Sequence, residues 1–205
     1  MKTQYHTPAI SVLMAAWQAE NTLHEAMESI LSQTFTNFEF LVVDDASTDS
    51  TPQILRNFAQ KDSRVQVFTN PTNQGLTRSL NGLLQKARGR FIARMDADDY
   101  ALPHRFRRQV DFLEAHPEYA GCGSWVADRQ NPRNILRLPT EAIAVQKAMI
   151  TGNPFIHPTV MLRAEFLRTH HLYYNEQYRS AQDYELWSRL LLKGKMTNIP
   201  EVLLL

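Results

Sequence analysis

The sequence predicts an α/β fold in which helices cover both faces of a central sheet, giving three layers. Two observations predict it. Over residues 1–100, short apolar runs alternate with amphipathic helical stretches, and acidic residues follow two of those runs. Strands that alternate with helices pair in parallel through right-handed crossovers, a nucleotide-binding type of arrangement. No internal repeat and no Gly- or Ser-rich linker interrupts the 205 residues, so we expect one composite domain with halves at 1–100 and 101–205.

The first half is predicted to contain four strands joined by three helices. The expected strands are the apolar stretches at residues 10–15, 38–43, 65–68 and 91–95. The helices begin near Thr22, Thr51 and Leu76. Thr22 is followed three residues later by Glu25, the capping-box pattern, and Thr51 is followed by Pro52, which is favoured at the first helical position.

The second half is less regular. The expected elements are helices at 103–116, 140–150 and 181–192 and strands at 121–127 and 159–162, with a loop rich in Pro, Asn and Arg at 128–139. The last residues, 201–205, form an apolar, strand-like run. Natural chain ends are usually polar and frayed, so we expect this sequence to be the front part of a longer protein, or its end to be covered by a partner.

Composition excludes several classes of protein. The net charge of +1 gives no overall field that would attract nucleic acid. A single cysteine, Cys122, excludes a disulfide framework and fits a reducing compartment. No apolar run is long enough to span a membrane, and no leader pattern precedes Pro8. We therefore expect a cytoplasmic chain, or one at the inner face of the membrane.

The most informative stretch is Asp96-Ala97-Asp98-Asp99, which follows the fourth apolar run. Ligands gather at the carboxyl ends of strands in open α/β sheets, and clustered carboxylates repel one another unless a cation lies between them. The residues alone leave two interpretations open. One is a divalent cation with an anionic ligand such as a nucleotide diphosphate, and the other is an acidic turn that caps the helix near Pro103.

A second polar turn, Asp44 to Asp49, follows the second apolar run. Part of it is explained by a turn and a helix cap, but an Asp at the tip of a second parallel strand can also bind a ribose hydroxyl or a base N–H. A dinucleotide dehydrogenase is disfavoured, because Ala15-Ala16-Trp17-Gln18 stands where such enzymes have a Gly-rich phosphate loop.

Several motifs together resemble a known family. They are Ser11-Val12-Leu13-Met14, Ser29-Ile30-Leu31-Ser32-Gln33-Thr34, the Asp44–Asp49 turn, Asn73-Gln74-Gly75-Leu76, the Asp96–Asp99 turn, Asn153-Pro154-Phe155-Ile156-His157-Pro158 and Gln182-Asp183-Tyr184-Glu185-Leu186-Trp187. In order and spacing they resemble the family 2 glycosyltransferases. The resemblance implies a GT-A fold with a Rossmann-like nucleotide-binding half and a mixed sheet. It also implies an inverting, metal-assisted sugar transfer, in the synthesis of surface polysaccharide or glycolipid.

The resemblance assigns roles to residues on the donor side. It implies that Asp45 contacts the uracil of a UDP-sugar and that Asp96 contacts the ribose. In the DXD-like motif, Asp98 would ligate Mg²⁺ or Mn²⁺, hard ions that prefer oxygen ligands. The remaining expected donor contacts are Ala15, Trp17, Glu20, Arg78 and Ala97, and His157 is a further candidate beside the metal or the acceptor.

On the acceptor side, Asp183 matches the family's general base. An Asp in the first turn of a helix is more often there only because the helix dipole stabilises its negative charge. The match with the family is the reason to assign Asp183 a catalytic role. The implied acceptor is a saccharide or a lipid-linked saccharide, which would bring the protein to the membrane as a peripheral protein.

One departure and two alternatives accompany this interpretation. Many family members have Pro-x-Tyr-Asn where this chain has Ala15-Ala16-Trp17-Gln18, so that Trp17 keeps the aromatic surface without the Pro-defined backbone. A nucleotidyltransferase would share the acidic metal site but would show a Gly- and Lys/Arg-rich loop after the first strand. A non-catalytic nucleotide-sugar-binding module of a larger synthase would keep the fold and lack turnover.

Overall fold

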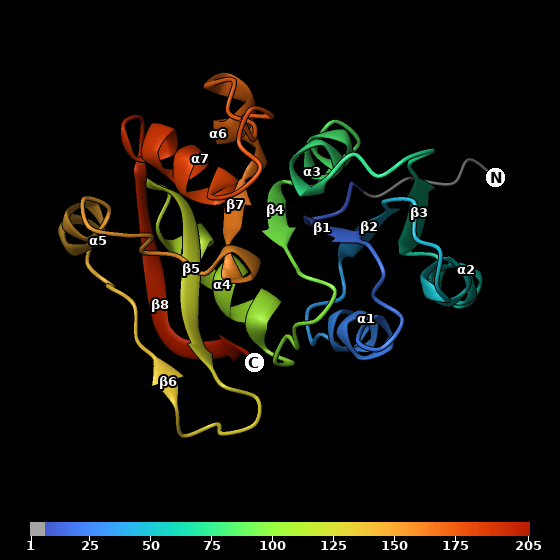
Figure 1. Ribbon diagram of the computed structural model, residues 1–205. Helices are drawn as coiled ribbons and strands as arrows, with labels where there is room; N and C mark the ends of the chain where they lie inside the picture. The colour runs from blue at the N-terminus through green and yellow to red at the C-terminus, as the bar shows by residue number, and fades with distance from the viewer. Residues whose placement is uncertain (1–6) are drawn as a thin grey trace.

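A computed structural model describes residues 7–205, and its first half has the predicted order of elements (Figure 1). Residues 1–6 lie outside the described residues. The expectation that no leader precedes Pro8 rests partly on them. The elements of the first half are β1 (Ile10–Ala16), α1 (Leu23–Leu31), β2 (Phe38–Asp44), α2 (Thr51–Lys61), β3 (Val65–Thr69), α3 (Leu76–Leu84) and β4 (Phe91–Arg94).

The predicted helix caps need a correction in detail. Thr22 does occupy the N-cap of α1, but its side chain makes no capping hydrogen bond. At α2 the N-cap is Ser50, and Thr51 is the first helical residue. The Thr51 hydroxyl accepts a hydrogen bond from the Ala19 backbone N–H instead (2.8 Å), which ties the loop after β1 to the start of α2.

The second half departs further from expectation. Its elements are α4 (Arg105–Ala115), β5 (Tyr119–Ala127), β6 (Ile135–Leu136), α5 (Ala142–Ala148), the 3₁₀ turn η1 (His157–Thr159), β7 (Met161–Arg163), α6 (Ala164–Thr169), α7 (Gln182–Leu191) and β8 (Lys195–Leu204). The sequence pattern missed β6 and α6. It placed one strand at 159–162, where Pro158 lies in η1 and the strand begins only at Met161.

Strand β8 is longer than the apolar run at the chain end suggested, because Pro200 interrupts the pattern. Proline cannot donate to a strand ladder, so its presence argues against a central strand. Here the register between β5 and β8 shifts after Ser124, where Ile199 pairs with Ser124 but Val202 pairs with Trp125. This irregularity accommodates Pro200 within a continuous strand.

The described residues form one eight-stranded mixed sheet, in the order β3-β2-β1-β4-β7-β5-β6, with β8 paired to β5. Strands β3, β2, β1 and β4 pair in parallel with one another. Strand β7 is antiparallel to both β4 and β5, and it joins the two halves of the sheet. The predicted mixed-sheet, three-layer α/β/α architecture is confirmed.

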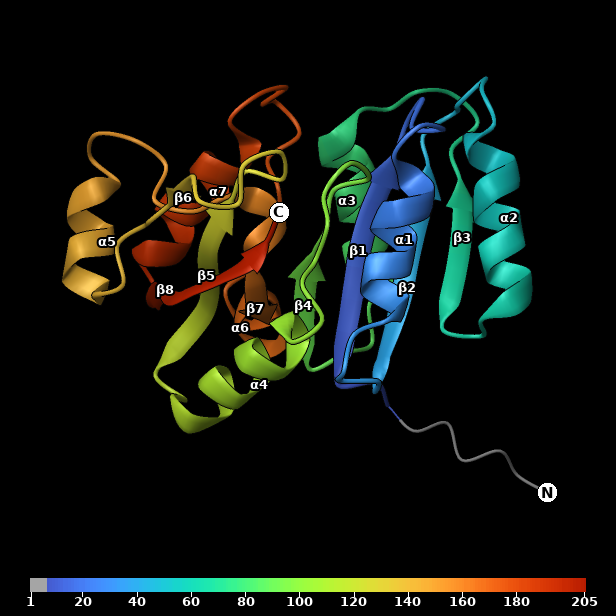
Figure 2. The ribbon, with the colours of Figure 1, turned by 90° about the horizontal axis from the view of Figure 1, so that it is seen from below.

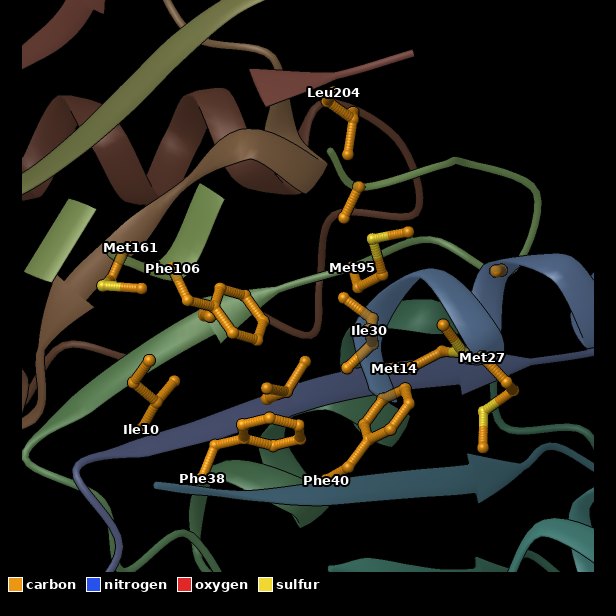
Figure 3. Close-up of a cluster of buried hydrophobic side chains, with 14 of the residues drawn as sticks. Ile10, Met14, Met27, Ile30, Phe38, Phe40, Met95, Phe106, Met161 and Leu204 are labelled. Carbon is orange, nitrogen blue, oxygen red and sulfur yellow. The ribbon is translucent and has the colours of Figure 1, made fainter. Parts of the chain in front are cut away.

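Two apolar cores hold the layers together, one on each face of the sheet. On one face, side chains of α1 and α4 pack against β1 and β2 (Figure 3). Their labelled members are Ile10, Met14, Met27, Ile30, Phe38, Phe40, Met95, Phe106, Met161 and Leu204. On the other face, α3, α6 and α7 cover the sheet, and the view in Figure 2 shows α1 and α3 on opposite sides of β1. Within residues 7–205 no helix has the length and apolar character needed to cross a bilayer.

Candidate active site

The carboxyl ends of β1, β2 and β4 meet at one edge of the sheet, as predicted. Ala16 pairs with Asp44 and Leu13 pairs with Arg94 in the parallel ladders. Beyond the strand ends, the Asp45 N–H donates to the Ala16 carbonyl (2.9 Å), and the Met95 N–H donates to the Leu13 carbonyl (3.1 Å). The two acidic turns therefore leave the sheet at the same edge.

A cleft of about 330 Å³ opens at this edge. Three of its lining residues are predicted donor contacts, namely Ala15, Trp17 and Asp45. The Trp17 side chain is 59% exposed, so a large aromatic surface is available to a planar ligand. The other lining residues are Ala16, Asn73, Gly75 and Leu76. Asn73, Gly75 and Leu76 belong to the Asn73–Leu76 motif, which is the sequence signal for their place in the site, whereas no motif indicates Ala16.

Asp45 organises the far wall of the cleft. Its buried carboxylate accepts hydrogen bonds from the Asn70 side-chain amide (2.7 Å) and from the backbone N–H groups of Gln74 (2.9 Å) and Gly75 (2.8 Å). Gly75 has φ +82°, a left-handed conformation that glycine adopts at little cost. A carboxylate has about four lone-pair sites, so Asp45 keeps capacity to accept a further N–H from a ligand.

Strained backbone flanks the cleft next to Trp17 and Asp45. Gln18 and Ala46, with φ 50° and 61°, are non-glycine residues in the left-handed region, where strain of about 1–3 kcal/mol is typical of functional sites. The Gln18 side-chain oxygen accepts hydrogen bonds from the N–H groups of Thr48 (2.8 Å) and Asp49 (3.3 Å). These bonds fix the segment that presents Trp17.

Glu20 contributes to the same bracing. Its carboxylate accepts a hydrogen bond from the Ser50 N–H (2.9 Å), and Glu20 is not among the residues that line the cleft. Its place in the fold is the joint between the loop after β1 and the start of α2. The predicted donor contact by Glu20 remains a prediction.

The acidic turn after β4 carries uncompensated negative charge. Asp96 accepts a hydrogen bond from the buried Arg94 guanidinium, while Ala97 and Asp98 form the turn and Asp98 is exposed. Burial, together with the neighbouring Asp96 and Asp98 carboxylates, raises the pKa of Asp99 to about 7, although the charges of Arg105 and Arg94 act to lower it. A group of oxygen donors with surplus negative charge fits a hard divalent cation.

The protein alone supplies an incomplete metal shell. Within the described part of the chain, no three His, Cys, Asp or Glu side chains converge on one point that could hold a metal ion. His157 belongs to no such group. Its Nε2 atom lies 2.7 Å from the Tyr174 hydroxyl, and burial together with the charge of Arg94 holds the pKa of His157 well below its ordinary value. A cation at Asp98 would therefore take further oxygen ligands from a bound diphosphate and from water.

Asp183 lies in the first turn of α7 without serving as its cap. The N-cap is Ala181, whose φ of 56° is another strained left-handed conformation. The Asp183 carboxylate accepts a hydrogen bond from the Asn153 side-chain amide (2.7 Å). Asn153 fixes this carboxylate from a loop that is distant in sequence.

Tyr174 shows that the fold brings the acidic turn and α7 together. Burial raises the pKa of the Tyr174 hydroxyl, the nearby Arg94 lowers it, and the carboxylates of both Asp183 and Asp96 raise it. The geometry agrees, because Arg94, which holds Asp96, and Trp187 of α7 line one small cavity together with Tyr174. Tyr174 and Arg94 were not predicted as site residues, because nothing in their local sequence indicates the contact.

Arg78 lies beside the cleft. Its guanidinium forms an ion pair with Glu176 (3.2 Å), and both side chains are largely exposed. Arg78 lines a second pocket of about 560 Å³, together with Tyr178 and Arg179. The second pocket shares Asn73, Gly75 and Leu76 with the cleft, so the two are continuous along that loop.

Comparison with known proteins settles the family. Residues 11–181 match the sequence profile described as "Glycosyl transferase family 2". The chain belongs to glycosyl transferase family 2. This match spans both acidic turns and ends just before Asp183, which lies outside the matched residues.

Relatives of this family 2 glycosyltransferase include bacterial proteins. The chain is 40% identical to EpsE of Bacillus subtilis over 191 residues, which is 91% of this chain and 68% of EpsE. It is 30% identical to WfaP of Escherichia coli over 186 residues, 90% of this chain and 71% of WfaP. WfaP is named as a UDP-Glc:alpha-D-GlcNAc-diphosphoundecaprenol beta-1,3-glucosyltransferase. The chain thus spans about two thirds of the length of these relatives.

A solved structure confirms the GT-A fold. The mannosyltransferase PcManGT of Pyrobaculum calidifontis, solved in complex with GDP-Man and Mn²⁺, matches with a TM-score of 0.78 at 22% identity. The match covers 97% of this chain and 56% of that chain. At this identity the likeness concerns the fold alone.

Proposed function

We propose that the chain transfers a sugar from a UDP-sugar to an acceptor hydroxyl, with inversion at the anomeric carbon, in the synthesis of bacterial surface polysaccharide or glycolipid. The observation that carries the proposal is a junction between the two halves. Arg94, which holds Asp96, lines one small cavity together with Tyr174 and with Trp187, and Trp187 lies on α7, the helix that carries Asp183. Donor and acceptor chemistry need such a junction, because one group must bind the nucleotide while another receives a proton.

The donor would bind along the edge formed by β1, β2 and β4. The uracil ring of the donor would lie against Trp17 and Ala15 and donate an N–H to the Asp45 carboxylate. Asp96 and Ala97 would lie at the ribose. Arg78 reaches the same loop from the neighbouring pocket and would contact the diphosphate. Family membership and the position of Trp17 support this arrangement.

The acidic turn would hold a divalent cation. Asp98 is the exposed carboxylate of that turn, and it would ligate Mg²⁺ or Mn²⁺ together with diphosphate oxygens. When bound, such an ion stabilises the negative charge on the departing diphosphate without a proton transfer. The clustering of three carboxylates supports the proposal, because Asp96 and Asp98 add to the effect of burial in raising the pKa of Asp99.

Asp183 would act as the general base. The acceptor oxygen forms a bond to the anomeric carbon from the face opposite the diphosphate, and its proton passes to the Asp183 carboxylate. The bond between the anomeric carbon and the diphosphate oxygen breaks, and its electron pair leaves with UDP. The Asn153 amide keeps one carboxylate oxygen fixed, so the other is free to face the acceptor.

The acceptor would be a saccharide, either free or linked to a lipid diphosphate, as the name of WfaP suggests for that relative. A lipid-linked acceptor would place the protein at the inner face of the membrane as a peripheral protein. The chain spans only about two thirds of the length of these relatives, so the acceptor and the membrane association are proposals for this chain.

Two measurements test the proposal. Calorimetry of the chain with UDP and ATP, with and without Mn²⁺, should show metal-dependent binding of UDP and none of ATP. A screen of UDP- and GDP-sugars against saccharide and lipid-diphosphate acceptors should then show UDP release. Metal-dependent UDP binding without any turnover would favour a nucleotide-sugar-binding module, and failure to bind UDP would contradict the proposal as a whole.

A further inference from the structure

A small cavity lies under α7, between β4 and the segment that contains η1 and β7. Its lining is mostly aliphatic, but it includes three side chains with polar groups, Arg94, Tyr174 and Trp187. Arg94 is 4% exposed, and Trp187 is completely buried. The space open to a water-sized molecule is about 10 Å³, which is at the limit for one water molecule and excludes a sugar or a phosphate.

Two buried N–H groups beside this cavity lack a partner. Among the described residues, neither Arg94 Nε nor Trp187 Nε1 has a hydrogen-bond acceptor within reach. The other two nitrogens of the Arg94 guanidinium are engaged, by the Met95 carbonyl and by the Asp96 carboxylate. Buried donors are nearly always paired, and leaving one unpaired costs about 1–3 kcal/mol.

The Tyr174 hydroxyl completes the set of polar groups. It lies 2.7 Å from His157 Nε2, and either group can donate, depending on the histidine tautomer. A hydroxyl oxygen has two lone pairs, so Tyr174 keeps at least one of them free in both cases. The site thus offers two donors and one acceptor, which is the requirement of a water molecule rather than of an anion or a cation.

The two unpaired donors belong to the two sides of the active site. Arg94 is the last residue of β4 and holds Asp96. Trp187 is four residues after Asp183 on α7, so the two residues lie one turn apart on the same face of that helix. A molecule that binds both N–H groups would connect the strand of the acidic turn to the helix of the proposed base.

We propose that one buried water molecule occupies this cavity, accepts hydrogen bonds from Arg94 Nε and Trp187 Nε1, donates to Tyr174, and makes Trp187 a positioning residue for Asp183. The water site itself rests only on the buried groups named above. The consequence for Asp183 rests on the proposed function.

The three tryptophans make the water site testable by NMR on the intact ¹⁵N-labelled chain. The Trp187 indole N–H, assigned by its loss in Trp187→Phe, should show a cross-relaxation signal to a long-lived water. The half-buried Trp125 indole donates to the Leu138 carbonyl (2.9 Å) and serves as the control that is paired within the protein, while the exposed Trp17 should show rapid solvent exchange. A Trp187 indole without a water signal would overturn the site.

A double-mutant cycle provides a second readout. Trp187→Phe and Arg94→Lys each remove one donor, and their effects on the unfolding equilibrium constant should be coupled by about threefold or more, because they share one water. Trp125→Phe combined with Arg94→Lys is the matched control and should be additive. Additivity in both pairs would contradict a shared water.

Kinetics test the positioning role separately. Trp187→Phe should lower kcat several-fold and leave the Kd for UDP unchanged, whereas Trp125→Phe should change neither. An unchanged kcat with a confirmed water signal would overturn the positioning role but keep the water site. A chain that has the water signal but no turnover at all would contradict the proposed function, and the water site would stand.

Discussion

The two halves of this molecule place their functional residues by different means. In the first half, site residues follow the ends of parallel strands, so that Ala15, Asp45 and Asp96 reach one sheet edge through the regular ladder of β1, β2 and β4. In the second half, Asp183 is held by an amide 30 residues away, and loop 173–178 is held by side chains of α3. Regular strand pairing builds one side of the site, and contacts of irregular loops build the other.

This difference suggests a division of labour. The first half forms the cleft and the acidic turn, which would bind the nucleotide part of the donor, the part that the proposed reaction leaves unchanged. The second half contributes the group that would receive the acceptor proton. Changes in the first half should therefore affect nucleotide affinity, and changes in the second half should affect turnover.

The largest expected effect concerns Asp183. In Asp183→Asn the side-chain oxygen can still accept from Asn153, so the fold should survive while the base is lost. We expect kcat to fall by about 10²–10⁴-fold, the usual contribution of a general base, with an unchanged Kd for UDP. Initial rates of UDP release and calorimetry measure the two quantities. The control is Glu185→Gln, which lies on the same helix and whose carboxylate accepts a hydrogen bond from Arg189. Retained turnover in Asp183→Asn would show that Asp183 is not the general base.

Asp98→Asn should show the opposite behaviour. Loss of a ligand carboxylate should weaken metal-dependent UDP binding by at least the roughly 10–100-fold that follows loss of an outer partner of a metal site. Binding of UDP measured without metal should change little, since Asp98 is exposed and holds no part of the fold. Asp111→Asn on the exposed face of α4 is the matched control. Equal losses with and without Mn²⁺ would argue against a metal at Asp98.

The same difference explains what could be predicted from the sequence. The strands and helices of the first half follow from local periodicity, and strand ends in a parallel sheet must share an edge, so Asp45 and Asp96 could be placed together. The link from Arg94 to Tyr174 and the pair of Asn153 with Asp183 depend on β7 inserting antiparallel between β4 and β5. No local pattern encodes that insertion. Pro158 and Pro200 lie next to β7 and within β8, where a proline argues against a strand.

Glu39 offers a test of the first half that leaves the site untouched. Its side chain is buried in β2 and accepts hydrogen bonds from Ser11 (2.6 Å) and from the Arg88 backbone and guanidinium. Burial raises the pKa of Glu39, but these hydrogen bonds and the charge of Arg88 outweigh it, so that the pKa lies below its ordinary value of 4.5. We expect Glu39→Gln to lower the free energy of unfolding at pH 7 by about 2 kcal/mol.

The sign of the pH dependence follows from the lowered pKa. The contribution of the Glu39 carboxylate is present above its unfolded pKa and is lost as the pH falls through the lower folded value. The difference between wild type and Glu39→Gln should therefore be largest near neutral pH and shrink below about pH 4. Urea titrations from pH 3 to pH 7 measure it. A difference that stays constant over this range would contradict the ionic role of Glu39.

The smallest effect is expected at Arg78, where the two halves meet at the surface. Exposed ion pairs contribute about 0–1 kcal/mol, so Arg78→Gln should destabilise the fold little and weaken UDP binding by no more than about fivefold. Glu176→Gln breaks the same ion pair but keeps the Arg78 charge, and it should leave UDP binding unchanged or slightly tighter. Both variants lose the ion pair between the halves, whereas only Glu176→Gln keeps the cation, and its amide oxygen can still accept the hydrogen bond from Asn81. A weakened affinity in both would mean that the contact itself shapes the cleft, and the division between a nucleotide-binding half and a turnover half would then fail at this point.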